Sequence, residues 1–232
     1  MNILLVGVAP FTNPLAALFE RGGHTCTRYT PSDFLAARAL PACEIFVEAE
    51  NTALETKRAI LERAPRAALL LSCALNASAT LAASWTRAPE RVVGFGVLPP
   101  IPETGTIELA RGLQTNDTAW AQAYDLWRAL GQKVVAVGDN AGLTRARIVC
   151  AIINEAFSAL QERVASPREI DLAMKLGTNY PRGPFEWGEL IGLETVLGVM
   201  DGLYAEWRQD RYRPAPLLVK YVAAKMTPRA DA

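Results

Sequence analysis

The sequence predicts an α/β domain with a doubly wound parallel sheet, followed by an all-helical C-terminal domain. Two observations lead to this prediction. Up to residue 138, short apolar runs typical of buried strands alternate with helical segments, as in proteins built on a parallel sheet. Beyond residue 138 the helical periodicity continues with no further strand signal. We therefore divide the chain into residues 1–138 and 139–232.

Each predicted strand is a short apolar run, and most are followed by a helical segment. The predicted strands cover residues 3–7, 24–30, 44–49, 67–72, 91–95, 106–109 and 133–137. The predicted helices of this domain cover residues 15–21, 55–64 and 117–130. This alternation is typical of a Rossmann-like fold, which binds nucleotides at the carboxyl ends of its strands.

The second domain begins with polar residues that are suited to start helices. Asp139 and Asn140 are candidate N-caps for a helix that extends to about Val164. The segment 166–169 (SPRE) combines a capping box with proline in the first turn, so a second helix should begin there. The segment 214–216 (PAP) predicts the start of a further helix near the end of the chain.

Composition excludes several classes of function. The chain of 232 residues has a formal net charge of zero, so there is no electrostatic basis for binding nucleic acid or an anionic membrane. The first strand begins at Asn2, which leaves no room for a signal peptide, and no apolar run approaches the length of a membrane span. The cysteines are isolated, without metal-binding spacing. These features predict a cytoplasmic protein without a metal site.

The turn after the first strand departs from the pattern that dinucleotide binding requires. That pattern is G-x-G-x-x-G, whereas this chain has GVAPFT at residues 7–12, so only Gly7 remains. Ala9 places a methyl group where the pyrophosphate would approach, and Pro10 removes a backbone N–H donor. Thr30 stands where an acidic residue would bind the adenosine ribose. We therefore expect no ordinary affinity for NAD, and no cofactor.

Three motifs near the C-terminus carry a resemblance to a known family. They are N-x-P-x-G-P at 179–184, [DE]-x-x-G-L-[DE] at 189–194 and R-x-x-P-x-P-x-L at 211–218. In this order and spacing they resemble the C-terminal domain of the 3-hydroxyacyl-CoA dehydrogenases. The resemblance implies a place in acyl-CoA and fatty-acid metabolism, NAD-dependent hydride transfer from a 3-hydroxyl carbon, and a homodimer formed by the C-terminal helices.

The same resemblance shows that the family's catalytic residues are mostly replaced. Glu108 matches the family's glutamate, but Gly96 stands at the position of the histidine base that this glutamate orients. Leu75 replaces a substrate-binding serine, and Ala146 replaces an asparagine. The only histidine of the chain, His24, lies in a turn before the second strand. Glu108 is therefore expected to be a remnant, either solvated or paired with an arginine.

Two cofactor-binding positions of the family are retained in part. Gly7 is the first glycine of the loop, and Lys57 matches a lysine that helps to bind the cofactor. A single lysine on a helix is more often a solvated surface residue, and Glu48 is expected to be a charge at the end of a strand. The basic helical hairpin that holds the CoA nucleotide in the family is missing between residues 30 and 44.

Taken together, these replacements predict a relative of the dehydrogenases that has no dehydrogenase activity. It would bind an acyl-type ligand or a partner protein and form a homodimer through residues 142–225. The alternative is an active NAD-dependent 3-hydroxyacyl-CoA oxidoreductase with a divergent cofactor loop and an altered substrate. A third interpretation is a subunit that pairs with a complete dehydrogenase and tunes its activity.

Overall fold

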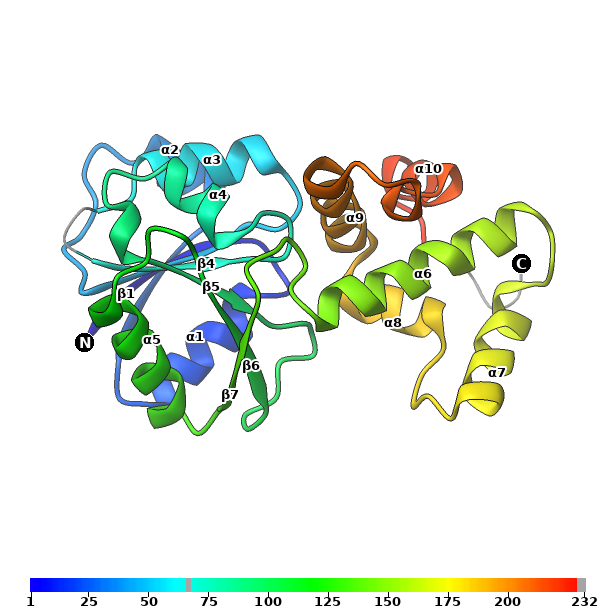
Figure 1. Cartoon of the computed structure of the whole chain (residues 1–232), viewed down its shortest axis with the longest axis horizontal. Coiled ribbons are helices and arrows are strands. Elements are labelled where there is room, and N and C mark those ends of the chain that lie inside the picture. The colour runs from blue at the N-terminus through cyan, green and yellow to red at the C-terminus, as the bar shows by residue number, and fades with distance from the viewer. Residues whose placement is uncertain (66–67, 229–232) are drawn as a thin grey trace.

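The protein consists of a sheet unit and a helical unit that lie side by side (Figure 1). The structure is a computed structural model that describes residues 1–65 and 68–228. The linker between the last strand and the first helix of the helical unit contains the predicted boundary at residue 138. Within the described residues, no helix is long and apolar enough to cross a membrane.

The sheet has the strand order β2-β1-β3-β4-β5-β6-β7. The strands are β1 (Asn2–Gly7), β2 (Thr25–Tyr29), β3 (Ile45–Ala49), β4 (Leu69–Cys73), β5 (Val92–Gly96), β6 (Thr106–Arg111) and β7 (Lys133–Val137). They lie close to the predicted runs, although residue 67 of the fourth prediction falls outside the described residues.

One strand pair differs from the all-parallel sheet that the sequence predicts. Strands β5 and β6 are antiparallel, and Gly96 lies opposite Glu108 in their register. The remaining pairs of neighbouring strands are parallel. Only residues 97–105 connect β5 to β6, which is too short a segment for the helical crossover that a parallel connection requires.

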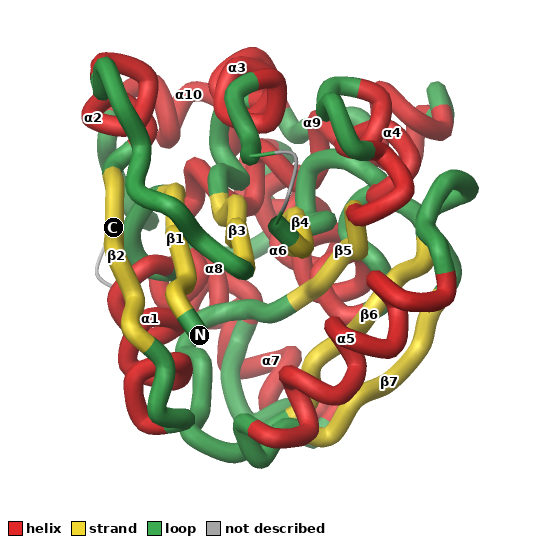
Figure 2. Tube along the Cα trace, turned by 90° about the vertical axis from the view of Figure 1, so that its left-hand side faces the viewer, coloured by secondary structure: helices red, strands yellow, loops and turns green. Residues whose placement is uncertain are grey.

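Helices cover both faces of the sheet (Figure 2). Helices α1 (Thr12–Arg21) and α5 (Asp117–Ala129) lie on one face, and α2 (Pro31–Ala36), α3 (Leu54–Glu62) and α4 (Ala79–Ser84) lie on the other. A short 3₁₀ turn, η1 (Pro89–Arg91), precedes β5. Alternation along β1 divides the core, because Ile3 and Leu5 pack with the α1 side whereas Leu4 and Val6 pack with the α2–α3 side.

The helical unit packs around its first and longest helix, α6. Its elements are α6 (Arg145–Gln161), α7 (Pro167–Thr178), α8 (Pro184–Ile191), α9 (Leu193–Trp207), η2 (Asp210–Tyr212) and α10 (Pro216–Ala224). Ser166 and Glu169 form the predicted capping box of α7. Gly192, with φ +89°, separates α8 from α9.

The predicted start of α6 is wrong by several residues. Asp139 does not cap α6; its carboxylate accepts hydrogen bonds from the backbone N–H groups of Ala79 at 2.6 Å and Thr80 at 2.9 Å, in the first turn of α4. The chain then passes through Gly142 and Leu143, both with positive φ, before α6 begins. Asp139 therefore fastens the linker to the sheet unit.

We predict that Asp139→Ala lowers the free energy of unfolding by about 0.5–2 kcal/mol, because two N–H groups at the start of α4 lose their acceptor. Urea unfolding followed by circular dichroism measures this change. Asp139→Asn, which keeps one oxygen, should lose less. Equal stability of the wild type and Asp139→Ala would show that the carboxylate does not hold the linker.

Candidate functional site

The candidate site lies where the carboxyl ends of strands β3 to β5 meet the first half of the antiparallel strand β6, and the helical unit covers this edge of the sheet (Figure 1). The linker meets the sheet unit where the backbone N–H of Gly142 donates to the carbonyl oxygen of Ala74 at 2.9 Å. The first turn of α6 lies against Glu108, and α9 lies on the loops that follow β3 and β4. In sheets of this kind the carboxyl edge is where ligands bind.

Glu108 is a buried carboxylate that holds the start of a helix. Its side chain is on β6, the residue is 7% exposed, and its two oxygens accept the backbone N–H of Arg145 at 3.1 and 3.3 Å. A negative charge at this point is also favoured by the helix dipole. The expectation that Glu108 is solvated or paired with an arginine side chain is therefore wrong. It is bound to the backbone of α6.

Leucine fills the space beside Gly96 where the family's histidine would project. A Cβ atom added to Gly96 would lie 2.6 Å from Cδ1 of Leu143 and 3.3 Å from Oε2 of Glu108. Leu143 is 4% exposed and packs with Ala74 and Ala110. The sequence did not single out Leu143, because a leucine before a helix is ordinary. Its φ of +47° and its contact with Gly96 appear only in the structure.

His24, the only histidine, lies at the other edge of the sheet. It precedes β2 and lines a cavity at the amino ends of the strands, together with Met1 and Glu44. Partial burial lowers the pKa of the His24 imidazole from its ordinary value. Because His24 lies at the amino ends of the strands, its imidazole cannot take part in chemistry beside Glu108.

Lys57 and Glu48 form a buried ion pair beneath the candidate site. Lys57 Nζ donates to Glu48 Oε2 at 2.6 Å and to the carbonyl oxygen of Cys73 at 2.9 Å, and both charged side chains are 0% exposed. The hydroxyl of Ser72 donates to the same carboxylate oxygen at 2.7 Å. The expectation of a solvated lysine is wrong, because α3 turns Lys57 inward. Glu48 lies near the end of β3, as expected, but it is buried.

This buried network is already satisfied without a ligand. Burial raises the pKa of the Glu48 carboxyl, and the charge and hydrogen bonds of Lys57 and the Ser72 hydroxyl act against that rise. An ion pair without access to water is stable only when such hydrogen bonds complete it. Lys57 is therefore engaged in holding α3 and β3 together in this structure.

The loop after β1 offers space for a ligand but few hydrogen-bond donors. A Cβ atom at Gly7 would lie 2.6 Å from the carbonyl oxygen of Ala49, so this glycine has a packing role of its own. The N–H of Thr12 donates to the carbonyl oxygen of Val8 at 3.4 Å, and Pro14 in the same first turn has no N–H. The loop and helix start therefore fit poorly with a bound pyrophosphate.

A cavity of about 430 Å³ nevertheless opens beside this loop, at the carboxyl ends of β1 and β2. Arg28 reaches across it to Asn13, with 3.3 Å between Nη1 and Oδ1. The hydroxyl of Thr30 donates to the carboxylate of Asp33 at 2.7 Å. Asp33 is thus engaged in the first turn of α2.

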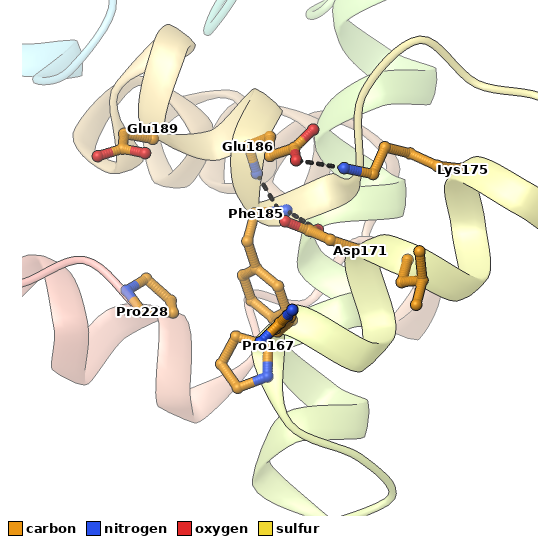
Figure 3. Close-up of a pocket in the computed structure, with 9 residues that line it drawn as sticks. Pro167, Asp171, Lys175, Phe185, Glu186, Glu189 and Pro228 are labelled. Atoms are coloured by element: carbon orange, nitrogen blue, oxygen red, sulfur yellow. Dashed lines mark hydrogen bonds and ion pairs between the residues drawn. The ribbon is translucent and has the colours of Figure 1, made fainter. Parts of the chain in front are cut away.

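A separate cavity of about 450 Å³ lies in the helical unit, between α7 and α8 (Figure 3). Three of its charged residues have structural partners. The Asp171 carboxylate accepts the N–H groups of Phe185 at 2.8 Å and Glu186 at 3.2 Å, and Lys175 forms an ion pair with Glu186 at 2.5 Å. These groups cap α8 and join it to α7. In the described part of the chain, no cluster of histidine, cysteine and carboxylate side chains could hold a metal ion.

Both units match models of one protein family. Residues 22–140 match the NAD-binding domain of the 3-hydroxyacyl-CoA dehydrogenases, and residues 142–232 match their C-terminal domain. The first match starts beyond the loop at residues 7–12. The predicted absence of a cofactor finds no support in this comparison, because most of the sheet unit resembles a domain that binds NAD.

Individual relatives agree with the family models. The chain is 35% identical to a 3-hydroxybutyryl-CoA dehydrogenase of Bradyrhizobium diazoefficiens over 80% of its own length and 64% of the relative's. It is 37% identical to a probable 3-hydroxybutyryl-CoA dehydrogenase of Bacillus subtilis over 78% of its own length and 64% of the relative's. The chain thus spans just under two thirds of the length of these curated relatives.

Solved structures show the same fold. A crystal structure of (S)-3-hydroxybutyryl-CoA dehydrogenase from Ralstonia eutropha superposes with a TM-score of 0.76 at 30% identity, covering 99% of this chain and 96% of that one. FadB2 of M. tuberculosis superposes with a TM-score of 0.81 at 21% identity, covering 98% and 95% of the two chains. With both units matched, the chain belongs to the 3-hydroxyacyl-CoA dehydrogenase family.

Proposed function

We propose that this member of the family has no dehydrogenase activity and acts as a ligand-binding or interaction protein. The observation that carries the proposal is the contact between Leu143 and Gly96. It supports the proposal because the position of the base is filled by a hydrocarbon side chain that cannot accept a proton.

The remaining residues do not replace the missing base. Oxidation of a hydroxyl requires a group that takes its proton, with a pKa suited to neutral pH. Both oxygens of Glu108 lie within hydrogen-bonding distance of the N–H of Arg145, and Leu143 lies against Gly96. Glu108 is thus engaged with the backbone at the start of α6.

A second candidate function is that of an active NAD-dependent 3-hydroxyacyl-CoA oxidoreductase with a divergent cofactor loop and an altered substrate. The comparisons favour it over a non-enzyme role, because the matched relatives are named as dehydrogenases and residues 22–140 match an NAD-binding domain. The cavity of about 430 Å³ beside β1 and β2 is also large enough for part of a nucleotide. Activity and binding measurements separate the two candidates.

We predict no enzyme-dependent loss of NADH absorbance with acetoacetyl-CoA, even at high protein concentration, with an active 3-hydroxybutyryl-CoA dehydrogenase as the positive control. Gly96→His alone should not restore activity, because its Cβ would lie 2.6 Å from Leu143 Cδ1. Turnover by the wild type would establish the second candidate. Rescue by the single substitution would show that cofactor and substrate still bind productively.

We also predict no saturable binding of NADH below millimolar concentration in a calorimetric titration. A micromolar dissociation constant requires about 8 kcal/mol of binding free energy. The loop at residues 7–12 offers too few N–H donors to the pyrophosphate to supply this. Saturable micromolar binding would contradict this account of the loop, even if no turnover followed.

The helical unit supports a further proposal, that two copies of the chain associate through it. Several large apolar side chains of this unit are exposed: Ile148, Val164, Leu172, Leu176, Leu190, Trp207, Val219 and Met226. Apolar surface on this scale is often covered by a second copy in a symmetric dimer.

Light scattering should therefore give about twice the chain mass of 25.2 kDa at micromolar concentration. Leu176→Asp, at a position that is 77% exposed within the chain, should yield a folded monomer. Leu113→Asp in the sheet unit, at a position that is 91% exposed, is the matched control and should remain dimeric. A monomeric wild type would favour the interpretation as a subunit of a mixed complex.

A further inference from the structure

A cavity of about 470 Å³ opens at the amino ends of the strands, at the edge of the sheet opposite Glu108. Three apolar side chains from β3, β4 and α5 form its inner wall: Ile45, Leu69 and Leu126. All three are buried and belong to the main core of the sheet unit. Met1, which is 49% exposed, also lines the cavity and contributes a flexible apolar side chain. The cavity thus has the size and the apolar wall of a site for a small molecule.

The polar residues that line this cavity have hydrogen-bonding capacity to spare. One oxygen of Glu44, Oε2, accepts the backbone N–H of Asn2 at 2.6 Å. Gln122 and Asp125 lie on α5, and within the described residues their side chains have no hydrogen-bond or ion-pair partner. The carboxylate of Asp125 and the second oxygen of Glu44 are therefore available to donors from a ligand.

The charge around the cavity determines which kind of ligand fits. Within the part of the chain that the structure describes, no lysine or arginine lines it. Burial lowers the pKa of the His24 imidazole, and the nearby N-terminal ammonium lowers it further against the opposing charge of Glu44. The imidazole is therefore neutral near pH 7 and does not offset the two carboxylates. Two negative charges against one N-terminal positive charge favour a cation and disfavour an anion.

We propose that this cavity binds an organic ammonium ion with an apolar body. The ammonium group lies at the carboxylates of Glu44 and Asp125, which accept its N–H donors. The apolar body lies against the wall formed by β3, β4 and α5 and covers the exposed side chain of Met1. This site is separate from the candidate site at the other edge of the sheet, so the inference does not rest on the proposed loss of activity.

His24 reports on occupancy of the cavity, because it lines the cavity and is the only histidine of the chain. Its imidazole signals are followed by NMR at constant pH while octylammonium, octanol or octanoate is added to the full chain. The three probes share one apolar tail and differ in the charge of the head group. Octylammonium should shift the His24 signals saturably, with a dissociation constant of about 1 mM or below. Octanol should bind more weakly, and octanoate should bind at least about tenfold more weakly than octylammonium.

Two substitutions of exposed carboxylates distinguish the cavity from the overall charge of the chain. Asp125→Asn should weaken octylammonium binding about threefold, because the ammonium group loses one carboxylate partner. Glu155→Gln in α6 is the matched control, since it removes the same charge at an exposed position of the helical unit and should leave the affinity unchanged.

Equal affinities for octylammonium and octanoate would overturn the proposal, as would equal affinities of Asp125→Asn and Glu155→Gln for octylammonium. Unchanged His24 signals up to about 10 mM octylammonium would also overturn it. The comparison of the three probes uses the wild type alone, so it does not depend on the folding of either variant.

Discussion

The contact of the helical unit with the carboxyl ends of β3 to β5 and with Glu108 in the first half of β6 determines the form of this protein. A single covalent linker joins the two units, so side chains and backbone groups at this edge must hold them together. Glu108 holds the start of α6, Leu143 packs against Gly96, and α9 lies directly on two loops. In a sheet of this class the same edge is the place for a ligand. The groups that hold the units together are thus drawn from the positions that binding and catalysis would use.

Much of the architecture follows from local patterns in the sequence. The buried strands β1, β3 and β4 are continuous apolar runs, and the capping box at Ser166 marks the start of α7. The direction of β6 does not follow from its composition, since it depends on the short connection from β5. The start of α6 was also missed, because Asp139 is a good cap by residue type but serves α4 from a distance in sequence.

The candidate site could likewise be predicted only in part from the sequence. The replacements expected at Gly96, Leu75 and Ala146 are inferred from motifs, but motifs do not predict the partners of the retained residues. Lys57 looks like a surface lysine in sequence and is fully buried, because Glu48 and the Cys73 carbonyl lie within reach only after α3 folds onto β3 and β4. A backbone partner, such as the one that Glu108 finds at residue 145, leaves no signature in the sequence at all.

Family membership favours dehydrogenase activity, whereas the local geometry at Gly96 favours its absence. The relatives are named as dehydrogenases, whereas the family resemblance assigns the position of the base to Gly96, against which Leu143 packs. A crystal structure of the protein grown with NADH and acetoacetyl-CoA addresses this conflict most directly. Our account predicts Leu143 against Gly96 and α9 on the loops at Asn51 and Asn76, with no nucleotide across the strand ends. A dinucleotide whose nicotinamide reaches Gly96, with Leu143 displaced, would contradict it.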